Sequence, residues 1–323
     1  MALRGGGTMS SLHHALAEYL EFRRKLGTRL YEPGISLGRF VDFLEAEGGE
    51  WITAECAVRW ATLPASVQPA TWARRLGHVR GFARWLKATD PRNEIPDRGL
   101  LSARHRRKPP YIFTDLEVRR LMAEAARLRS LAGLRSLTYV TLIGLLASTG
   151  LRPGEPLALD MSDVDFDKGV LAVRETKFGK SRFVPVTDST RAALERYANR
   201  RQELCRPGWS DAFFVSEHGG RLVACTARGI FARLSCAIGI RTSIAGRRLG
   251  RGPRQQDLRH SFATRKLIEW YRAGIDVTRK MPALSTYLGH GSVHATYWYI
   301  QAVPELLQLA TKHSAACAPG GAS

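Results

Sequence analysis

The sequence is poor in cysteine and has no long apolar segment, and each lack excludes a class of protein. Its five cysteines are odd in number and widely scattered, so they form neither a disulfide framework nor a CxxC metal site. No apolar run reaches the roughly 18–20 residues that span a membrane. The Gly- and Ser-rich start is not a secretory signal, and no P-loop or nucleotide fingerprint appears. We therefore expect a cytoplasmic protein with no metal and no cofactor.

Acidic residues are scarce as well. The chain has 29 Asp and Glu against 49 Lys and Arg, which gives a formal net charge of +20. This balance indicates a polyanionic partner, and nucleic acid is the commonest one. A GC-rich genome is an alternative source of the arginines, since only nine of the basic residues are lysines. That alternative explains arginine in place of lysine, but not the excess over Asp and Glu.

Residues 10–91 have the periodicity of a helical domain. Apolar residues recur at helical spacing over 12–26, where Phe22 is among them, and again over 35–46 and 71–87. The last of these segments carries the basic residues Arg74, Arg75, Arg80, Arg84 and Lys87 on its outer face. Because the segment contains no acidic residue, this face favours contact with a phosphate backbone, although an ordinary solvated surface is the alternative.

Residues 92–112 are predicted to be a linker. They follow Pro91 and contain three further prolines and a basic run in which Arg106, Arg107 and Lys108 are candidate DNA contacts. Such a hinge can let two parts of a protein close around a duplex. We expect residues 1–9 and 316–323 to be disordered.

Residues 113–315 are predicted to form the second domain. It opens with a capping box from Thr114 to Glu117 and continues into a nearly all-apolar helix over 137–148. Three short strands are expected at 164–166, 170–174 and 182–186, followed by helices near 188–203, 225–238, 257–273 and 283–288 and a last helix that carries Tyr299. The predicted fold is mainly α with one small antiparallel β-sheet, an α+β domain.

Four segments bring together residue types suited to phosphoryl transfer. They are 147–155 with Arg152, 176–182 with Lys177, 256–264 with Arg259, and 288–299, in which His290 precedes Tyr299 by nine residues. A tyrosine is a poor nucleophile at neutral pH because its phenol ionises near pH ~10. Nearby cations can stabilise the phenolate and the charge that develops on its target.

In this order and spacing the segments resemble the signature boxes of the tyrosine recombinase (phage integrase) family. The pattern T-G-L-R-x-x-E matches residues 149–155, H-x-L-R-H-[ST]-F-A-T matches 256–264 except at its first position, and L-G-H…T-x-x-Y matches 288–299. The resemblance is strong over 114–313. It is weaker over 10–90, which is similar to the family's helical core-binding domain. It implies a C-shaped two-domain clamp on DNA.

The resemblance implies a role for each residue. Arg152 and Arg259 contact the scissile phosphate, for which a bidentate guanidinium is suited. Lys177 is the general acid for the leaving 5′-oxygen, with Lys180 as the competing candidate. His290 donates a hydrogen bond to the phosphate. The remaining residues are supporting: Glu155 and Asp257 orient the basic cluster, and His260 is structural.

Tyr299 is the predicted nucleophile. Tyr297 lies two residues earlier, about 200° away around a helix, so both cannot face one phosphate. The nine-residue spacing from His290 selects Tyr299 and leaves Tyr297 and Trp298 as packing residues.

Gln256 departs from the family pattern, which has histidine there. Glutamine can donate a hydrogen bond but cannot titrate. Loss of one such group typically costs ~10²–10³-fold in rate. We therefore hypothesise that Gln256 keeps a phosphate contact and slows or re-routes proton transfer.

Further basic residues are expected to contact the DNA backbone. These are Lys180, Arg182, Arg247, Arg248 and Arg251, with Glu175 as an alternative partner for Arg182 and a mobile loop as an alternative state for 241–254. The segment 303–313 is apolar on one side, and in the family such a segment docks on the next protomer of a cyclic tetramer. Docking on its own domain is the alternative.

The predicted function is site-specific recombination of double-stranded DNA by a bacterial, nucleoid-associated protein, in integration, excision or transposition of a mobile element. A type IB topoisomerase and a catalytically impaired DNA-binding accessory protein are the alternatives. Other recombinases or accessory proteins are possible partners.

Overall fold

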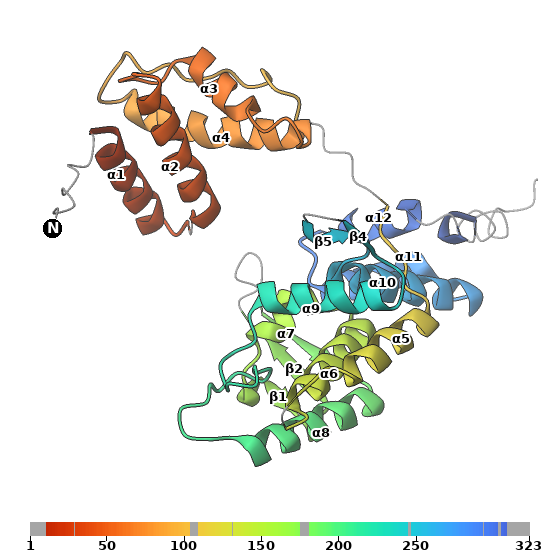
Figure 1. The fold of residues 1–323 in the computed structure, drawn as a ribbon. Helices are drawn as coiled ribbons and strands as arrows, with labels where there is room; N and C mark the ends of the chain where they lie inside the picture. Colours follow the sequence, from red (N-terminus) through yellow and green to blue (C-terminus); the bar gives the residue numbers. More distant parts are fainter. Residues whose placement is uncertain are drawn as a thin grey trace, which may run out of the picture. The chain divides into compact units, whose positions relative to one another are not determined.

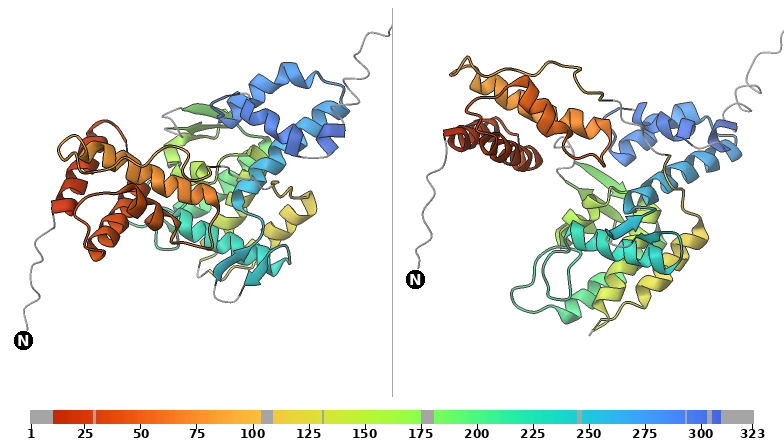
Figure 2. Two further views of the ribbon diagram at one scale, coloured as in Figure 1. Left: turned by 90° about the horizontal axis from the view of Figure 1, so that it is seen from above. Right: turned by 45° about the horizontal axis from the view of Figure 1, so that its top comes forward.

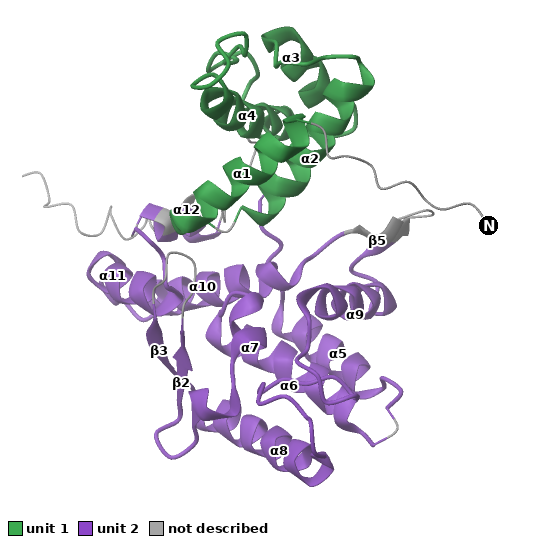
Figure 3. Ribbon diagram, turned by 90° about the vertical axis from the view of Figure 1, so that its left-hand side faces the viewer, with its two compact units in different colours: residues 1–108 green, residues 109–323 purple. Residues whose placement is uncertain are grey.

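The computed structural model describes residues 11–28, 30–103, 109–130, 132–174, 181–244, 247–292, 294–302 and 305–308. The chain divides into two compact units, Met1–Lys108 and Pro109–Ser323 (Figure 3). Within the described ranges, no helix is both long and apolar enough to cross a membrane. The first unit has one apolar core of its own, and the second has two.

The N-terminal unit is built from α1 (Ser11–Lys25), α2 (Tyr31–Ala46), α3 (Ala54–Thr62) and α4 (Pro69–Leu86) (Figures 1 and 2). Local signals define their ends: the Thr53 side chain caps α3, and Pro69 is the first residue of α4. The apolar faces meet around Phe40, Trp60 and Phe82, each at most 2% exposed. The predicted helical character of this region is therefore confirmed.

Two details of this unit differ from the sequence-based prediction. Phe22, expected on the inner face of α1, is 51% exposed. Residues after 91, expected to belong to the linker, pack on the unit: Asn93 is 2% exposed and its Oδ1 accepts the Ile52 N–H (3.0 Å), while the Glu94 N–H donates to the Ile52 carbonyl (2.8 Å). The proline-rich composition of this segment does not indicate these hydrogen bonds.

The C-terminal unit begins with α5 (Asp115–Ala126), whose capping box between Thr114 and Glu117 is present as predicted. Helix α6 (Leu134–Thr149) is buried around most of its circumference, since it packs against α5, α8 (Asp188–Leu204) and α10 (Gln255–Arg272) (Figure 1). A short α7 (Gly154–Ala158) and a 3₁₀ turn (Met161–Asp163) follow α6. The central apolar helix therefore ends directly beside the candidate site.

The predicted antiparallel sheet is present, with strand order β1 (Val164–Asp165), β2 (Val170–Val173) and β3 (Arg182–Pro185). Leu171 pairs with Val184 in the β2–β3 ladder, and both are fully buried. A second sheet was not predicted: β4 (Thr242–Ile244) and β5 (Arg247–Arg251) form a hairpin over the stretch expected to be a possible loop. Its arginine-rich composition lacks the apolar alternation that indicates a strand.

The remaining helices are α9 (Ala224–Ala237), α11 (Val277–Leu288) and α12 (His294–Ala302). Helix α11 begins six residues earlier than predicted, because Asp276 caps it by accepting the Arg279 N–H (3.1 Å). Pro282 therefore lies inside the helix, on its exposed side, and does not open it. The mainly helical α+β fold predicted from the sequence is confirmed.

Candidate active site

Gly150 ends α6 and sets the backbone of the site. It adopts a left-handed conformation (φ 63°), and a Cβ on it would lie 2.5 Å from the Phe262 ring, so only glycine fits here. Its carbonyl accepts a hydrogen bond from Arg259 Nη1 (2.8 Å). The end of α6 is thereby joined to α10.

Arg152 follows this turn and is held by Glu155, three residues later. The Glu155 carboxylate accepts from the Arg152 backbone N–H (2.8 Å) and from Arg152 Nη1 (2.9 Å), and also from Arg182 Nη1 (3.1 Å) and Nη2 (2.8 Å). Burial works to raise the pKa of Glu155, but the two arginines outweigh it and hold that pKa below its ordinary value. Glu155 is therefore an ionised carboxylate between two guanidiniums, as predicted for an orienting residue.

Three arginines meet the C-terminal end of α11. Arg182 Nε donates to the Tyr287 carbonyl (2.8 Å), Arg259 Nη2 to the Leu288 carbonyl (2.7 Å), and Arg152 Nη2 to the Gly289 carbonyl (2.6 Å). Carbonyls at a helix C-terminus lack partners within the helix and carry partial negative charge, so they suit guanidinium donors. Three successive residues thus fix three cations.

Arg182 is an internal residue, which corrects two expectations. Its side chain is 12% exposed, and its carboxylate partner is Glu155. We had expected a DNA phosphate or Glu175 as its partner, and Glu175 lies outside the described residues. Gly289 (φ 68°) also leaves room for Arg182, whose Nη1 would lie 2.8 Å from a Cβ at that position. The alternating register of β3 is the signal that could have placed Arg182 inward, since it lies on the face of buried Val184.

Arg259 is the most enclosed of the three cations. It is 1% exposed, and its pKa is lowered to about 10, chiefly by burial; Tyr299 and Glu155 act to raise this pKa and Arg152 acts to lower it. It therefore stays protonated at neutral pH. A desolvated guanidinium with fixed geometry interacts strongly with any anion that reaches it.

His290 lies directly after the αL residue Gly289. Its Nδ1 is 2.7 Å from the Thr296 Oγ1, and its ring stacks on that of Tyr299 with 6.1 Å between centroids and 23° between planes. Burial, together with the charges of Arg259 and Arg152, lowers the pKa of His290 to about 4. Its imidazole is therefore neutral at physiological pH.

Tyr299 is 2% exposed, whereas Tyr297 is 36% exposed. Burial raises the pKa of Tyr299, while Arg259 and Arg152 act to lower it. The His260 and Trp298 rings also contact Tyr299, at 5.4 and 5.6 Å between centroids. The structure thus brings Tyr299 into the arginine cluster and leaves Tyr297 at the surface, where it was expected to be a packing residue.

Two adjacent glutamines open α10 and have different environments. Gln255 is 6% exposed and donates to the Ala227 carbonyl of α9 (3.3 Å), whereas Gln256 is half-buried. Asp257 accepts from Arg254 in a capping box at the start of the same helix. Among the described residues, its carboxylate accepts hydrogen bonds from Arg254 and from none of the arginines of the cluster, so it orients Arg254.

Several predicted DNA contacts have partners within the protein. The Arg75 guanidinium lies 3.8 Å from the Trp60 ring and donates to the Trp60 carbonyl (2.8 Å), and Arg80 donates to the carbonyls of Pro96 (2.6 Å) and Asp97 (2.7 Å). Arg74 pairs with Glu32 at 3.2 Å. Arg84 and Lys87 are exposed. The basic face of α4 is therefore narrower than predicted.

Other predicted residues lie outside the described part of the chain. These are Lys177, Lys180, Arg106, Arg107 and Lys108, together with the side chains of Arg247, Arg248 and Arg251. In the segment 303–313, only 305–308 are described: Leu306 is buried in the core that contains Tyr299, and Arg272 pairs with Glu305 (2.9 Å). Leu306 thus packs on its own unit.

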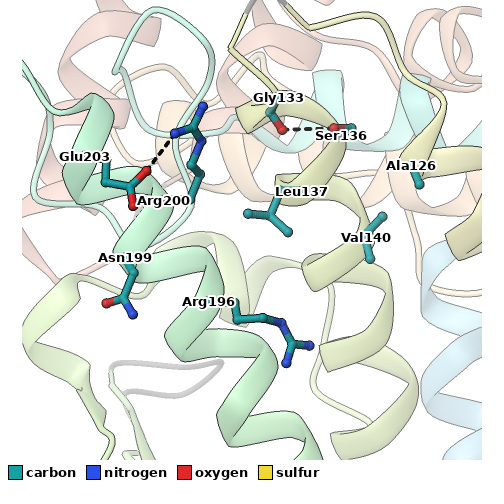
Figure 4. A pocket seen from close by; sticks show the side chains of 9 residues that line it. All are labelled: Ala126, Gly133, Ser136, Leu137, Val140, Arg196, Asn199, Arg200 and Glu203. Carbon is teal, nitrogen blue, oxygen red and sulfur yellow. Dashed lines mark hydrogen bonds and ion pairs between the residues drawn. The ribbon is translucent and has the colours of Figure 1, made fainter.

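A surface hollow lies between α6 and α8 (Figure 4). Its lining includes Leu137, Val140 and Arg200 and none of the cluster residues. Arg200 Nη1 donates to Glu203 (2.6 Å), so this cation is already paired.

Comparisons of the sequence and of the structure with known proteins point to one family. Residues 112–305 match the profile of the phage integrase family. A putative integrase/recombinase of Sinorhizobium fredii, y4rB, is 44% identical over 308 residues, which cover 94% of this chain and 97% of that protein. The tyrosine recombinase XerD of Caulobacter vibrioides is 30% identical over 249 residues, 76% of each chain.

Solved structures show the same fold. The Tn1549 transposon integrase, in complex with transposon right end DNA, superposes with a TM-score of 0.64 at 18% identity, over 94% of this chain and 99% of that one. A lambda integrase dimer bound to a COC′ core site gives a TM-score of 0.61 at 17% identity, over 89% of this chain and 76% of that one. The chain belongs to the phage integrase family, the tyrosine recombinases.

Proposed function

We propose that this chain cleaves and rejoins DNA at a specific site through a covalent bond to Tyr299. The phenolic oxygen attacks the phosphorus of a backbone phosphodiester, the bond from phosphorus to the 5′-oxygen breaks, and the leaving 5′-oxygen takes up a proton. A 3′-phosphotyrosyl link conserves the bond energy until a 5′-hydroxyl of a partner strand attacks it. The observation that carries this proposal is the placement of Tyr299 among two fixed guanidiniums and a neutral imidazole.

Arg152 and Arg259 are the proposed phosphate ligands. Each guanidinium has five N–H donors, and the hydrogen bonds to Gly150, Leu288, Gly289 and Glu155 orient the groups without using all of them. Preorganised donors of this kind need no rearrangement when charge develops on the phosphate. His290 adds a hydrogen bond from a neutral ring.

Lys177 is the proposed general acid, with Lys180 as the competing candidate. The segment that carries both joins β2 to β3, and β3 begins at Arg182, which is bonded to Glu155 and to Tyr287. This places one end of the segment at the arginine cluster. A lysine beside several cations loses its proton more readily, which suits protonation of a leaving oxygen.

Tyr299 must become accessible before it can attack, because its side chain is 2% exposed. We propose that DNA binding displaces the residues that cover α12. Gln256, on the first turn of α10, is proposed to contact the phosphate in place of the family's histidine. It leaves the phenolic proton to another acceptor.

Double-stranded DNA is the proposed partner, contacted by the exposed Arg84 and Lys87 of α4 among others. We propose that both units contact the duplex, and the division of the chain into two compact units supports this proposal. We propose a homotetramer on two duplexes, with the C-terminal segment beyond residue 308 as the connecting element. A cyclic assembly needs one donor and one acceptor surface per subunit.

The test uses a nicked suicide duplex that carries the site recovered by selecting random duplexes with the Tyr299→Phe variant. We expect a covalent protein–DNA adduct with the wild type and none with Tyr299→Phe. An adduct that persists in Tyr299→Phe, or no adduct with the wild type, would refute the assignment. Relaxation of a supercoiled plasmid without the site would instead indicate a type IB topoisomerase.

A further inference from the structure

Thr296 is a hydrogen-bond partner of the His290 ring. It lies on the first turn of α12, one helical turn before Tyr299, and is 0% exposed. Its Oγ1 is 2.7 Å from the His290 Nδ1, a short hydrogen bond. The same helix therefore holds both the ring that stacks on His290 and the hydroxyl that bonds to it.

A neutral imidazole carries one N–H, on either Nδ1 or Nε2. The hydrogen bond at one nitrogen decides which nitrogen keeps the proton. His290 is neutral at physiological pH because burial and the facing groups Arg259, Arg152, His260 and Arg182 lower its pKa. The tautomer, and hence the direction of any hydrogen bond to a phosphate, therefore depends on the group at Nδ1.

The direction of the Thr296–His290 bond follows from burial. If Nδ1–H donated to Oγ1, the hydroxyl proton of Thr296 would need another acceptor, and none is present among the described residues. A buried donor without a partner costs about 1–3 kcal/mol. If the hydroxyl donates to Nδ1, Thr296 is satisfied, and the Nε2–H of the half-buried His290 can meet water or a phosphate.

We propose that Thr296 is a positioning residue that donates to Nδ1 of His290 and so keeps the imidazole in the Nε2–H tautomer, ready to donate to the scissile phosphate. The role in cleavage rests on the proposed function above. The sequence contained the signal, since Thr296 is the threonine of T-x-x-Y, but spacing alone does not reveal its hydrogen-bond partner.

The matched variants are Thr296→Val, which is nearly isosteric and lacks the hydroxyl, and Thr296→Ser, which keeps it. Thr138→Val is the control, because Thr138 is also buried (1% exposed), and its hydroxyl donates to the Leu134 carbonyl (2.8 Å) away from His290. All four full-length proteins, wild type included, are labelled with ¹⁵N-histidine. The His290 signals among the nine histidines are identified by their loss in His290→Gln.

We expect Nε2–H and unprotonated Nδ1 signals for His290 in the wild type, in Thr296→Ser and in Thr138→Val. Thr296→Val should give the Nδ1–H tautomer or a mixture. An Nδ1–H signal in the wild type, or a Thr296→Val spectrum equal to that of the wild type, would overturn the proposal. Protein stability alone does not set the tautomer, so a merely structural role of Thr296 leaves these signals unchanged.

Adduct formation on the selected suicide duplex tests the link to catalysis. Thr296→Val should form adduct about two- to tenfold more slowly at saturating DNA, since one neutral hydrogen bond is worth roughly 0.5–1.5 kcal/mol and about 1.4 kcal/mol is tenfold in rate. Thr296→Ser should restore most of the rate. A wild-type rate in Thr296→Val would overturn the catalytic part. Absence of adduct with the wild type would refute the proposed function, whereas the spectra still decide the Thr296–His290 bond.

Discussion

Glu155→Gln tests whether the carboxylate between Arg152 and Arg182 holds the site together. The substitution keeps the size of the side chain and removes its charge. Four donor contacts between 2.8 and 3.1 Å converge on the Glu155 carboxylate in the wild type. Glu155 is 7% exposed, so the two guanidiniums lose a partner in a poorly hydrated place. Removal of one partner from a buried ion pair costs about 3–5 kcal/mol. We expect a loss of that size in the free energy of unfolding of the C-terminal unit.

The control is Glu203→Gln, the same chemical change in an exposed pair. Glu203 accepts from Arg200 at 2.6 Å and its side chain is 61% exposed, so the expected loss is about 0–1 kcal/mol. Unfolding of the full chain in urea is measured by hydrogen exchange of peptides from α6 and α11. These peptides report the free energy of unfolding of the C-terminal unit alone. Equal losses for the two variants would refute the reasoning.

The pH dependence provides a second criterion. The pKa of Glu155 is held below its ordinary value in the folded protein. Its contribution to stability is therefore fully present above the unfolded pKa, near ~4.3, and is lost as pH falls through the lower folded pKa. The difference in stability between wild type and Glu155→Gln should thus shrink below that range and be constant between pH 6 and 8. A difference that grows in acid would contradict this account.

Further predictions concern four single side chains. Gln256→His should add an ionisation near pH ~6.5 to the pH profile of adduct formation and raise its rate, and an unchanged rate with an unchanged profile would reject a role for Gln256. Arg84→Ala should weaken binding to the selected duplex and reduce the salt slope by about one, whereas Arg75→Ala should lower the melting temperature because Arg75 bonds to Trp60. The pKa of His290 lies at about 4 in the folded protein and near ~6.5 in the unfolded chain. The contribution of its neutral imidazole to the free energy of unfolding is therefore fully present above pH ~6.5 and is lost as pH falls towards 4. His290→Gln should flatten the acid destabilisation between these two pH values.

The sequence was sufficient for the parts of the fold that have strong local signals. The capping box at Thr114, the apolar helix α6 and the strands β1, β2 and β3 were predicted with small errors at their ends, because each has a clear pattern. The β4–β5 hairpin and the start of α11 were missed. The first is rich in arginine, and the second begins at the Asp276 cap, upstream of the predicted start at residue 283, with Pro282 inside the helix.

Side-chain partners were less predictable than elements. Motif spacing placed Arg152, Arg259, His290 and Tyr299 in one site, and the structure brings these four together. Arg182 looked like a surface cation, since its contacts at Glu155 and Tyr287 lie 27 and 105 positions away in the chain. Contacts at such separations depend on the packing of α11 against β3, which no local pattern encodes.

The net charge of the whole cluster matches the charge of the proposed transition state. Three guanidiniums, those of Arg152, Arg182 and Arg259, stand against the one carboxylate of Glu155, which leaves two net positive charges. A phosphodiester carries one negative charge, and attack by a phenolate makes two in the transition state. The carbonyl end of α11 holds these cations in place beforehand, so little reorganisation is needed as the second charge develops. Because His290 is neutral, the hydrogen bond proposed for it leaves the net charge of the cluster at two, equal to the charge of this transition state.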